Sequence, residues 1–255
     1  FMQKNLPQYA PDWIERTDQW SEASHRTVHY PVCADRRTLL WLANQRAIEF
    51  HPALMDRQSR QTMLIIDLDP PEDADFDAVI TVAGAVREVL EDLELEAALK
   101  TSGSKGVHIL LPLDPEHRVE DVAAATRAIA QRTAEHDPEH ATVAYVKDER
   151  GGKVFVDSTR AGGATVAAAY SPRVRPGLPV SYPLAWSELA AARPADFTIR
   201  TVPDLLDRAE VGDPWRGTMP SPQRLPDHLI AQGHQIPIAR VAAMHEGKRR
   251  RRAQG

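Results

Sequence analysis

Four regions in the middle of the chain carry hydrophobic patterns that predict its main elements. Residues 63–69 form an apolar run that ends in acidic side chains, which is typical of a buried strand. Apolar positions recur every three or four residues over 76–93, and the pattern over 119–134 predicts a second helix. Residues 97–113 predict a strand, a glycine turn and another strand. Strands and helices do not alternate regularly, which favours an α+β fold with a mixed or antiparallel sheet and flanking helices over a doubly wound one.

Weaker patterns predict the elements on either side of this central region. They predict an irregular lead-in before residue 39, a helix over 39–47, a short strand over 48–51, alternating strands and turns over 143–170 with a hairpin at 162–163, an extended segment over 172–183 and a short helix over 186–192. After Trp215 the composition shifts toward Pro, Gln, His and Arg. We therefore expect a main domain over residues 1–215 and a peripheral extension over 216–255 that ends in a basic tail at 248–252.

The composition narrows the class of protein. With 255 residues, 42% hydrophobic and 26% charged, the chain has the balance of an ordinary soluble globular protein. Its single cysteine, Cys33, excludes an intramolecular disulfide and a cysteine-rich zinc site. A net charge of −5 argues against a surface that coats nucleic acid throughout, and leaves local basic patches at 173–175 and 248–252. No apolar stretch has the length of a membrane span, so we expect a cytoplasmic protein without membrane contact.

Three aspartates at the ends of predicted strands are the main candidates for chemistry. Side chains alternate along a strand, so Asp67 and Asp69 share one face while Leu68 points into the core. Asp157 ends the apolar run over 153–157 and adds a third carboxylate if the two strands are neighbours. Carboxylates a few ångströms apart oppose each other's ionisation, and hard divalent ions such as Mg²⁺ or Mn²⁺ relieve that repulsion. The three aspartates therefore predict metal-dependent phosphoryl or nucleotidyl transfer.

The pair Asp67 and Asp69 also fits other functions when it is taken alone. A haloacid-dehalogenase-type phosphatase with Asp67 as nucleophile, a sugar-nucleotide glycosyltransferase and a simple pair of helix caps are the alternatives to a polymerase-type metal pair. The phosphatase pattern requires Thr or Val soon after the second aspartate, whereas Pro70-Pro71 follows here, and Gly212-Asp213 is a poor match for its later acidic pair. A degenerate nucleic-acid-binding module without catalysis is the non-enzymatic alternative.

The turn at residues 102–106, Ser-Gly-Ser-Lys-Gly, suits an anion. It offers backbone N–H groups, two hydroxyls and the ammonium of Lys105, although it lacks the spacing of a Walker loop. Alone it is an ordinary polar turn, but the aspartates upstream favour phosphate binding. His51 and His108 lie in or beside predicted strands next to these segments. For His51, this position favours a structural role and a functional role equally.

Arginines lie on both sides of Asp157 in the sequence: Arg150, Arg160, Arg173 and Arg175. Such a group either balances the charge of the carboxylates or recognises phosphates through bidentate contacts. The sequence alone does not distinguish the two roles.

Taken together, these segments resemble the bacterial primase–polymerases of the archaeo-eukaryotic primase superfamily, in particular the polymerase domain of bacterial DNA ligase D and its stand-alone, ligase-C-associated relatives. The motifs that carry the resemblance are Phe1-Met2-Gln3-Lys4-Asn5, Ile48-Glu49-Phe50-His51-Pro52, Asp67-Leu68-Asp69-Pro70, Lys100-Thr101-Ser102-Gly103-Ser104-Lys105-Gly106-Val107-His108, the segment 169–177 and Gly212-Asp213-Pro214-Trp215. The resemblance implies a template-dependent nucleotidyltransferase that adds nucleotides, by preference ribonucleotides, to primer 3′ ends in short gaps or at broken ends during DNA repair.

The resemblance also implies roles for individual residues. It implies that Asp67, Asp69 and Asp157 hold two divalent ions, Mn²⁺ or Mg²⁺, that His51, Ser102, Lys105, Gly106 and Arg173 bind the nucleoside triphosphate, and that Arg150 and His108 support the site. We expect a local basic groove with Lys4 and Arg175, together with Phe1, to bind gapped or broken double-stranded DNA near the nucleoid. The implied protein partners are an ATP-dependent DNA ligase and end-binding proteins.

The chain departs from the family pattern at several positions. Family members carry a further segment before the Phe1 motif, so the N-terminal part of the family domain is expected to be missing. Met2 stands where an aromatic residue is frequent, which weakens stacking on template bases. The form Asp-Ser-Thr-Arg at 157–160 resembles the ligase-C-associated branch, and no Lys-x-Asp-Gly adenylation motif is present.

Overall fold

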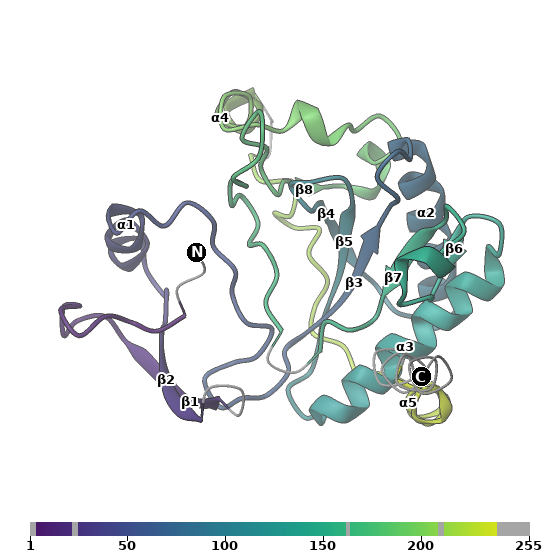
Figure 1. Ribbon diagram of the computed structural model, residues 1–255, viewed down its shortest axis with the longest axis horizontal. Helices are drawn as coiled ribbons and strands as arrows, with labels where there is room; N and C mark the ends of the chain where they lie inside the picture. Colours follow the sequence, from purple (N-terminus) through teal and green to yellow (C-terminus); the bar gives the residue numbers. More distant parts are fainter. Residues whose placement is uncertain (1–3, 22–24, 162–163, 209–211, 239–255) are drawn as a thin grey trace, which may run out of the picture. The chain divides into compact units, whose positions relative to one another are not determined.

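The computed structural model describes residues 4–21, 25–161, 164–208 and 212–238. The chain divides into two compact units between Ile48 and Glu49, and each is described here by itself (Figure 1). Phe1, the glycine pair at 162–163 and the basic tail at 248–252 lie outside the described residues. The division expected at residue 215 is a different one and stays a prediction.

The first unit contains a two-stranded hairpin and one helix. Strand β1 (Arg16–Ser21) pairs antiparallel with β2 (Arg26–Pro31), and helix α1 (Arg36–Asn44) follows. The expectation of an irregular lead-in is wrong here, because polar residues on both faces of the hairpin obscure the short alternation of Val28 and Tyr30 in β2. The helix begins earlier than predicted because the side chain of Asp35 accepts a hydrogen bond of 2.7 Å from the N–H of Thr38 and caps it.

The second unit is built on a six-stranded sheet with the order β6-β7-β3-β5-β4-β8. Its strands are β3 (Met63–Asp69), β4 (Ala98–Thr101), β5 (Val107–Pro112), β6 (Ala141–Thr142), β7 (Val154–Asp157) and β8 (Pro183–Leu184). All neighbours are antiparallel except β6 and β7, which are parallel. The predicted mixed sheet and the predicted strands at 63–69 and 97–113 are confirmed.

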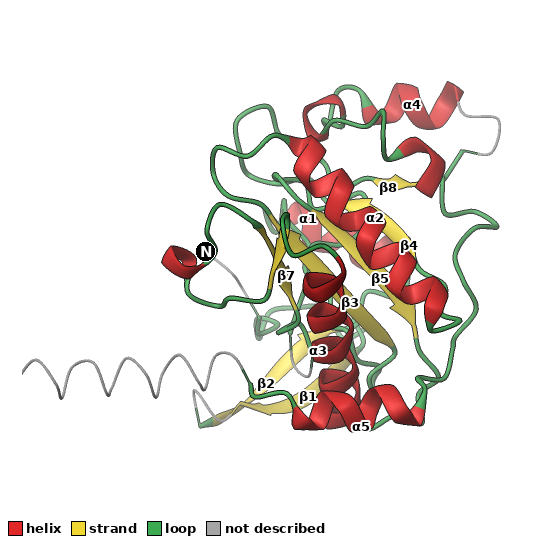
Figure 2. Ribbon diagram, turned by 90° about the vertical axis from the view of Figure 1, so that its right-hand side faces the viewer, coloured by secondary structure: helices red, strands yellow, loops and turns green. Residues whose placement is uncertain are grey.

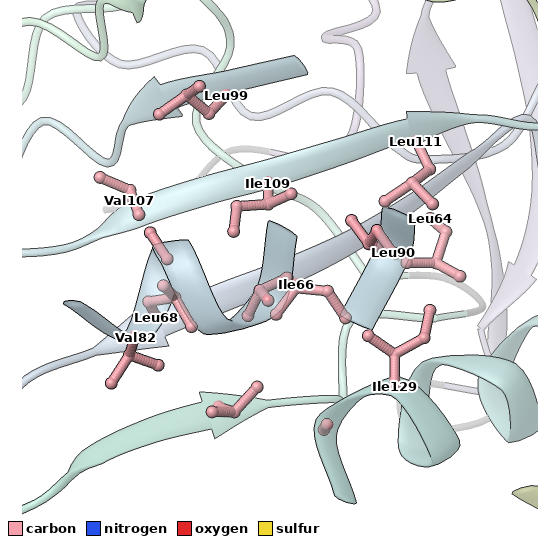
Figure 3. Packing of buried hydrophobic residues seen from close by; sticks show 14 of the residues in the cluster. Leu64, Ile66, Leu68, Val82, Leu90, Leu99, Val107, Ile109, Leu111 and Ile129 are labelled. Carbon is pink, nitrogen blue, oxygen red and sulfur yellow. The ribbon is translucent and has the colours of Figure 1, made fainter. Parts of the chain in front are cut away.

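Two long helices cover one face of this sheet. They are α2 (Phe76–Asp92) and α3 (Val119–His136), which lie side by side in front of the strands in Figure 2. Apolar side chains from the strands meet the apolar sides of both helices in one continuous core (Figure 3): Leu64, Ile66, Leu68, Val82, Leu90, Leu99, Val107, Ile109, Leu111 and Ile129. Leu68 is fully buried here, so the predicted alternation along β3 is confirmed. This core fixes the strands that carry the site.

In the described part of the second unit, no such helices lie on the opposite face of the sheet (Figure 2), which divides into two parts. One part is a small apolar cluster of Leu54, Ile65, Leu110 and Val166, with Trp215 packed against it. The other part carries polar side chains, which form the candidate site. Leu54, Val166 and Trp215 come from loops, so this cluster packs those loops against the sheet beside the polar part.

Several weaker predictions are wrong or only partly right. Residues 48–51 form no strand: the carbonyl of Phe50 accepts from the N–H of Ala168, but the N–H of Phe50 donates to the side chain of Ser171, which interrupts a ladder. Within the described part of 143–170 only β7 forms a strand. The helix expected over 186–192 is a single 3₁₀ turn. The remaining short elements are η1 (Lys147–Glu149), η2 (Trp186–Glu188), η3 (Pro194–Asp196) and α4 (Val202–Arg208).

The described part of the predicted extension packs against the main sheet unit. Helix α5 (Asp227–Gln235) lies against α3 (Figure 2), and the two backbones approach closely at Gly233. A Cβ atom on Gly233 would lie 1.8 Å from the carbonyl oxygen of Ala124, so only glycine fits there. In the described part of the chain, no helix is long and apolar enough to cross a membrane.

Candidate active site

Four polar side chains form one row across the face of the sheet opposite α2 and α3. Asp67 on β3 lies directly opposite Asp157 on β7 and opposite His108 on β5, and His108 lies opposite Lys100 on β4. Residues directly opposite each other in an antiparallel pair project from the same face. The row Asp157–Asp67–His108–Lys100 is therefore fixed by strand register alone.

The carboxylates of Asp67, Asp69 and Asp157 form the acidic end of this row. Each offers an oxygen, and these oxygens lie within 4.8 Å of one another. Asp67 and Asp157 are buried, whereas Asp69 is exposed at the mouth of the cluster. Burial, and then the charge of Asp69, raise the pKa of Asp67 to about 7; partial desolvation and the charge of Asp157 raise that of Asp69.

Such a cluster fits divalent cations. Three carboxylates in a partly buried position repel one another, and oxygen donors are the ligands that Mg²⁺ and Mn²⁺ prefer. The convergence predicted from the strand pattern is present, and helix capping by Asp67 or Asp69 is not seen in the described part of the chain. The three aspartates are thus suited to hold metal ions.

Arg160 connects two of the carboxylates. Its guanidinium lies 2.9 Å from Oδ2 of Asp67 and 3.4 Å from Oδ2 of Asp157. Burial disfavours its charge, but the three carboxylates outweigh burial and raise the pKa of Arg160. Among the described residues it is the only arginine or lysine within ion-pair distance of this cluster, a role that the sequence did not distinguish from those of the neighbouring arginines.

Arg150 was expected to support the carboxylates, and it lies farther from them than Arg160 does. Its guanidinium stacks on the ring of Phe155, 3.9 Å from the ring centroid, and donates to the carbonyl of Ala144. Phe155 lies directly opposite Asp69 in the β3–β7 pair. The charge of Arg150 therefore opposes the rise in the pKa of Asp69 without a direct ion pair.

The other end of the row is buried and basic. Lys100 is 2% exposed, and its Nζ lies 2.6 Å from both Nδ1 of His108 and Oγ of Ser181. Nε2 of His108 faces Oδ1 of Asp67 at 3.4 Å. Burial lowers the pKa of Lys100 to about 7 and that of His108 well below its usual value. No role was predicted for Lys100 or Ser181, although Lys100 begins the motif at residues 100–108.

The turn at residues 102–106 is folded around the side chain of Ser102. Oγ of Ser102 accepts hydrogen bonds of 3.2 Å from the N–H groups of Ser104 and Gly106. A Cβ atom on Gly106 would lie 1.9 Å from the carbonyl oxygen of Leu68, so this glycine lets the turn touch β3 next to Asp69. The turn is therefore held against the carboxylate-bearing strand.

Lys105 projects from the same turn, and its ammonium donates to the backbone carbonyl of Glu72. Lys105 is at the surface, and a phosphate would replace the carbonyl of Glu72 as its acceptor. Phosphate binding by Ser102, Lys105 and Gly106 stays a prediction.

Glu49 organises two further predicted nucleotide-binding residues. Its Oε2 lies 2.9 Å from Nε2 of His51 and 3.1 Å from Nε of Arg173, and its Oε1 accepts from the N–H of Val174. Burial opposes ionisation of Glu49, but the contacts with His51, Val174 and Arg173 outweigh it and lower its pKa to about 2. Arg173 also donates to the carbonyl of Ser102 at 2.8 Å, which joins it to the turn.

Two of the predicted DNA-contacting residues, Lys4 and Arg175, lie in the described part of the chain. Arg175 is exposed in the second unit, and Lys4 is exposed in the first. Their role in a basic groove stays a prediction.

The carboxylate cluster and the basic side chains around it, on a mixed α+β sheet, are the arrangement of a nucleotidyltransferase-type enzyme. The family model for the LigD primase-polymerase domain matches residues 1–215. The chain belongs to this family, whose members are polymerases and primases of DNA repair.

Individual relatives agree with the family model. The "Bifunctional non-homologous end joining protein LigD" of Bacillus subtilis is 35% identical over 240 residues, which cover 92% of this chain and 38% of that protein. The "Multifunctional non-homologous end joining protein LigD" of Mycolicibacterium smegmatis is 33% identical over 220 residues, covering 84% of this chain and 28% of that protein. The chain thus spans well under half the length of these curated relatives.

A solved structure shows the same fold. The polymerase domain from Mycobacterium tuberculosis ligase D in complex with DNA superimposes with a TM-score of 0.76 at 32% identity, covering 86% of this chain and 80% of that one. The resemblance drawn from the motifs is confirmed, and the phosphatase alternative is wrong.

Proposed function

We propose that this protein adds nucleotides, by preference ribonucleotides, to primer 3′ ends in short gaps or at broken DNA ends, using two divalent ions held by Asp67, Asp69 and Asp157. The observation that carries the proposal is the cluster of three carboxylate oxygens within 4.8 Å on adjacent strands, in a chain of this family. Mn²⁺ and Mg²⁺ both suit these ligands.

The bound ions and the residues around the carboxylates would have separate roles in catalysis, nucleotide binding and positioning of the metal ligands. Bound ions would lower the pKa of the primer 3′ hydroxyl and offset charge on the departing pyrophosphate. Lys105 and Arg173 would bind phosphate oxygens of the incoming triphosphate, with Ser102 and Gly106 shaping the turn. His51, held by Glu49, would contact the nucleotide and the primer end. Arg150, Arg160 and His108 would keep the carboxylates in place.

The DNA partner follows from the same proposal. The neighbour of known structure is a polymerase domain in complex with DNA, which supports gapped or broken double-stranded DNA as the substrate here. Phe1, Lys4 and Arg175 would contribute to a local basic surface on a chain of net charge −5. An ATP-dependent DNA ligase and end-binding proteins would act with it at the nucleoid, in the cytoplasm.

Primer extension on labelled DNA with a short gap tests this proposal. The protein is incubated with Mn²⁺ or Mg²⁺ and with ATP or dATP opposite template thymine, and kcat/KM is measured for each nucleotide. The expected result is incorporation that depends on the metal, with ATP preferred. Asp67→Asn should abolish extension and leave binding to gapped DNA largely intact.

Other outcomes separate the remaining possibilities. Binding to gapped DNA without incorporation under any condition would identify a degenerate module. A clear advantage of dATP over ATP would contradict the ribonucleotide preference alone. Substantial incorporation by Asp67→Asn in Mn²⁺ would contradict the assignment of the metal ligands.

A further inference from the structure

Lys100 is an unusual lysine for its position. It is among the largest fully buried side chains of the protein, although a buried ammonium is costly without a compensating charge. In the described part of the chain no carboxylate lies within ion-pair distance of it. Its hydrogen-bond partners are Nδ1 of His108 and Oγ of Ser181. Hydrophobic packing alone would be served better by leucine or methionine, so the polar contacts themselves need an explanation.

The hydrogen bonds around Lys100 define which group donates. Oγ of Ser181 uses its hydrogen on the carbonyl of Thr101, at 2.7 Å, so it accepts from Lys100. The ammonium of Lys100 carries three hydrogens and no lone pair, so it only donates. One hydrogen points to Ser181, and another is available for Nδ1 of His108.

The opposite side of His108 leads to the same assignment. Its Nε2 faces Oδ1 of Asp67 at 3.4 Å, so a hydrogen on Nε2 points toward that oxygen. A donor at Nδ1 leaves that ring nitrogen without a hydrogen, so the ring hydrogen lies on Nε2. A neutral imidazole has one N–H, and the tautomer with hydrogen on Nε2 satisfies Lys100 and Asp67 together.

We propose that Lys100 is a positioning residue: by donating to Nδ1 it holds His108 in the Nε2–H tautomer, so that His108 steers one oxygen of Asp67 and leaves the other for metal. Ser181 anchors the Lys100 ammonium in this chain of contacts. Groups that orient a metal ligand through hydrogen bonds change metal affinity or activity by roughly 10–100-fold when they are removed. The proposal rests on the metal site proposed above.

The direct test is the tautomer of His108 in the metal-free protein. With ¹⁵N-labelled histidine, a long-range ¹H–¹⁵N spectrum distinguishes the protonated from the unprotonated ring nitrogen, and His108→Asn assigns the signals. Wild type is expected to show hydrogen on Nε2 and a free Nδ1. Lys100→Met, which keeps the length of the side chain but cannot donate, should populate the Nδ1–H form.

The second measurement is Mn²⁺ affinity, followed by the electron paramagnetic resonance signal of the free ion. Lys100→Met should weaken binding by roughly 10-fold or more. Ser181→Ala, a milder variant that loses only the anchor, should weaken it less and shift the tautomer in the same direction. Thr133→Val is the matched control, since it removes a buried hydroxyl that bonds within α3 at 2.9 Å, far along the chain from the row.

These measurements test the positioning role of Lys100 independently of the proposed polymerase function. An Nδ1–H tautomer in wild type overturns it, and so does unchanged Mn²⁺ affinity in a folded Lys100→Met variant. If Lys100→Met does not fold, Ser181→Ala alone decides, with an unaltered tautomer and affinity overturning the proposal. A different result would contradict the proposed metal site: Mn²⁺ affinity of Asp67→Asn equal to that of wild type.

Discussion

Glu49 and Arg173 lie 124 residues apart in the sequence, yet Oε2 of the glutamate lies 3.1 Å from Nε of the arginine. The same oxygen lies 2.9 Å from Nε2 of His51. One carboxylate therefore orients two of the three basic side chains that the family resemblance places at the nucleotide. Arg173 also donates to Ser102 in the turn. The predicted triphosphate contacts thus depend on a residue that itself carries negative charge.

We expect Glu49→Gln to raise the KM for the nucleotide by about 10-fold, with a smaller change in kcat. Charge-assisted hydrogen bonds stabilise by about 1.5–3 kcal/mol, and the glutamine loses the charge that holds His51 and Arg173. Steady-state primer extension measures both constants. Glu88→Gln is the matched control, because Glu88 also pairs with a histidine, His136 at 2.6 Å, but on the exposed side of the helices. Equal KM values for the two variants would refute the role of Glu49.

Arg160→Gln should make stability depend more strongly on metal. Without the guanidinium between Asp67 and Asp157, the carboxylates repel one another, so the melting temperature in EDTA should fall by several degrees. Mn²⁺ should then raise it more in the variant than in wild type, since the ion replaces the missing positive charge.

Thermal melting with and without Mn²⁺ measures this difference. Arg87→Gln serves as control, because Arg87 pairs with Glu91 at 2.8 Å on an exposed helix surface. The same Mn²⁺-induced increase in wild type and Arg160→Gln would show that Arg160 does not offset the charge of the cluster.

Lys105→Ala should raise the nucleotide KM or lower kcat and leave the affinity for gapped DNA unchanged. Among the described residues its ammonium bonds to the carbonyl of Glu72 alone, and a phosphate would replace that contact. Lys153 is a close match, since it is exposed and donates to the carbonyl of Pro138 at 2.6 Å. Lys153→Ala should therefore leave both constants near wild type. Loss of DNA binding in Lys105→Ala would place that lysine in the DNA surface instead.

Lys100 should give the stability a pH dependence. Its folded pKa of about 7 lies below the unfolded value, so between pH 7 and 10.5 the unfolded state binds more protons. Stability should therefore rise with pH in this window, whereas below pH 7 the destabilisation is present in full. From pH 7.5 to 9.5 the gain relative to Lys100→Met should be about 2 kcal/mol. Urea unfolding in EDTA measures it, and parallel curves for the two proteins would contradict it.

The sequence predicted those parts of the site that depend on local pattern. The bounds of β3 follow from one continuous apolar run, and strand alternation places Asp67 and Asp69 on the face away from Leu68. The glycine turn before β5 is equally local. These features need no knowledge of distant residues, which explains why they were predicted correctly.

Features that depend on pairing across the sheet could not be predicted in the same way. Arg160 is one of several arginines near Asp157, and only the β3–β7 register brings it to Asp67. Lys100 and Ser181 meet because β4 and the segment before β8 are neighbours, which no periodicity encodes. The β1–β2 hairpin was missed since polar residues occupy both of its faces.

The row that joins Asp157, Asp67, His108 and Lys100 restricts how the length of the chain can vary. Side chains change face at every residue of a strand, so a one-residue insertion within β3 would turn Asp67 toward the helices and bring an aliphatic neighbour to the row. A two-residue insertion would restore the face but shift the carboxylate along the strand by about 7 Å, out of reach of its partners. Insertions and deletions should therefore be tolerated only in the connecting loops, and the spacing within these strands should be invariant among active variants selected from a random-insertion library.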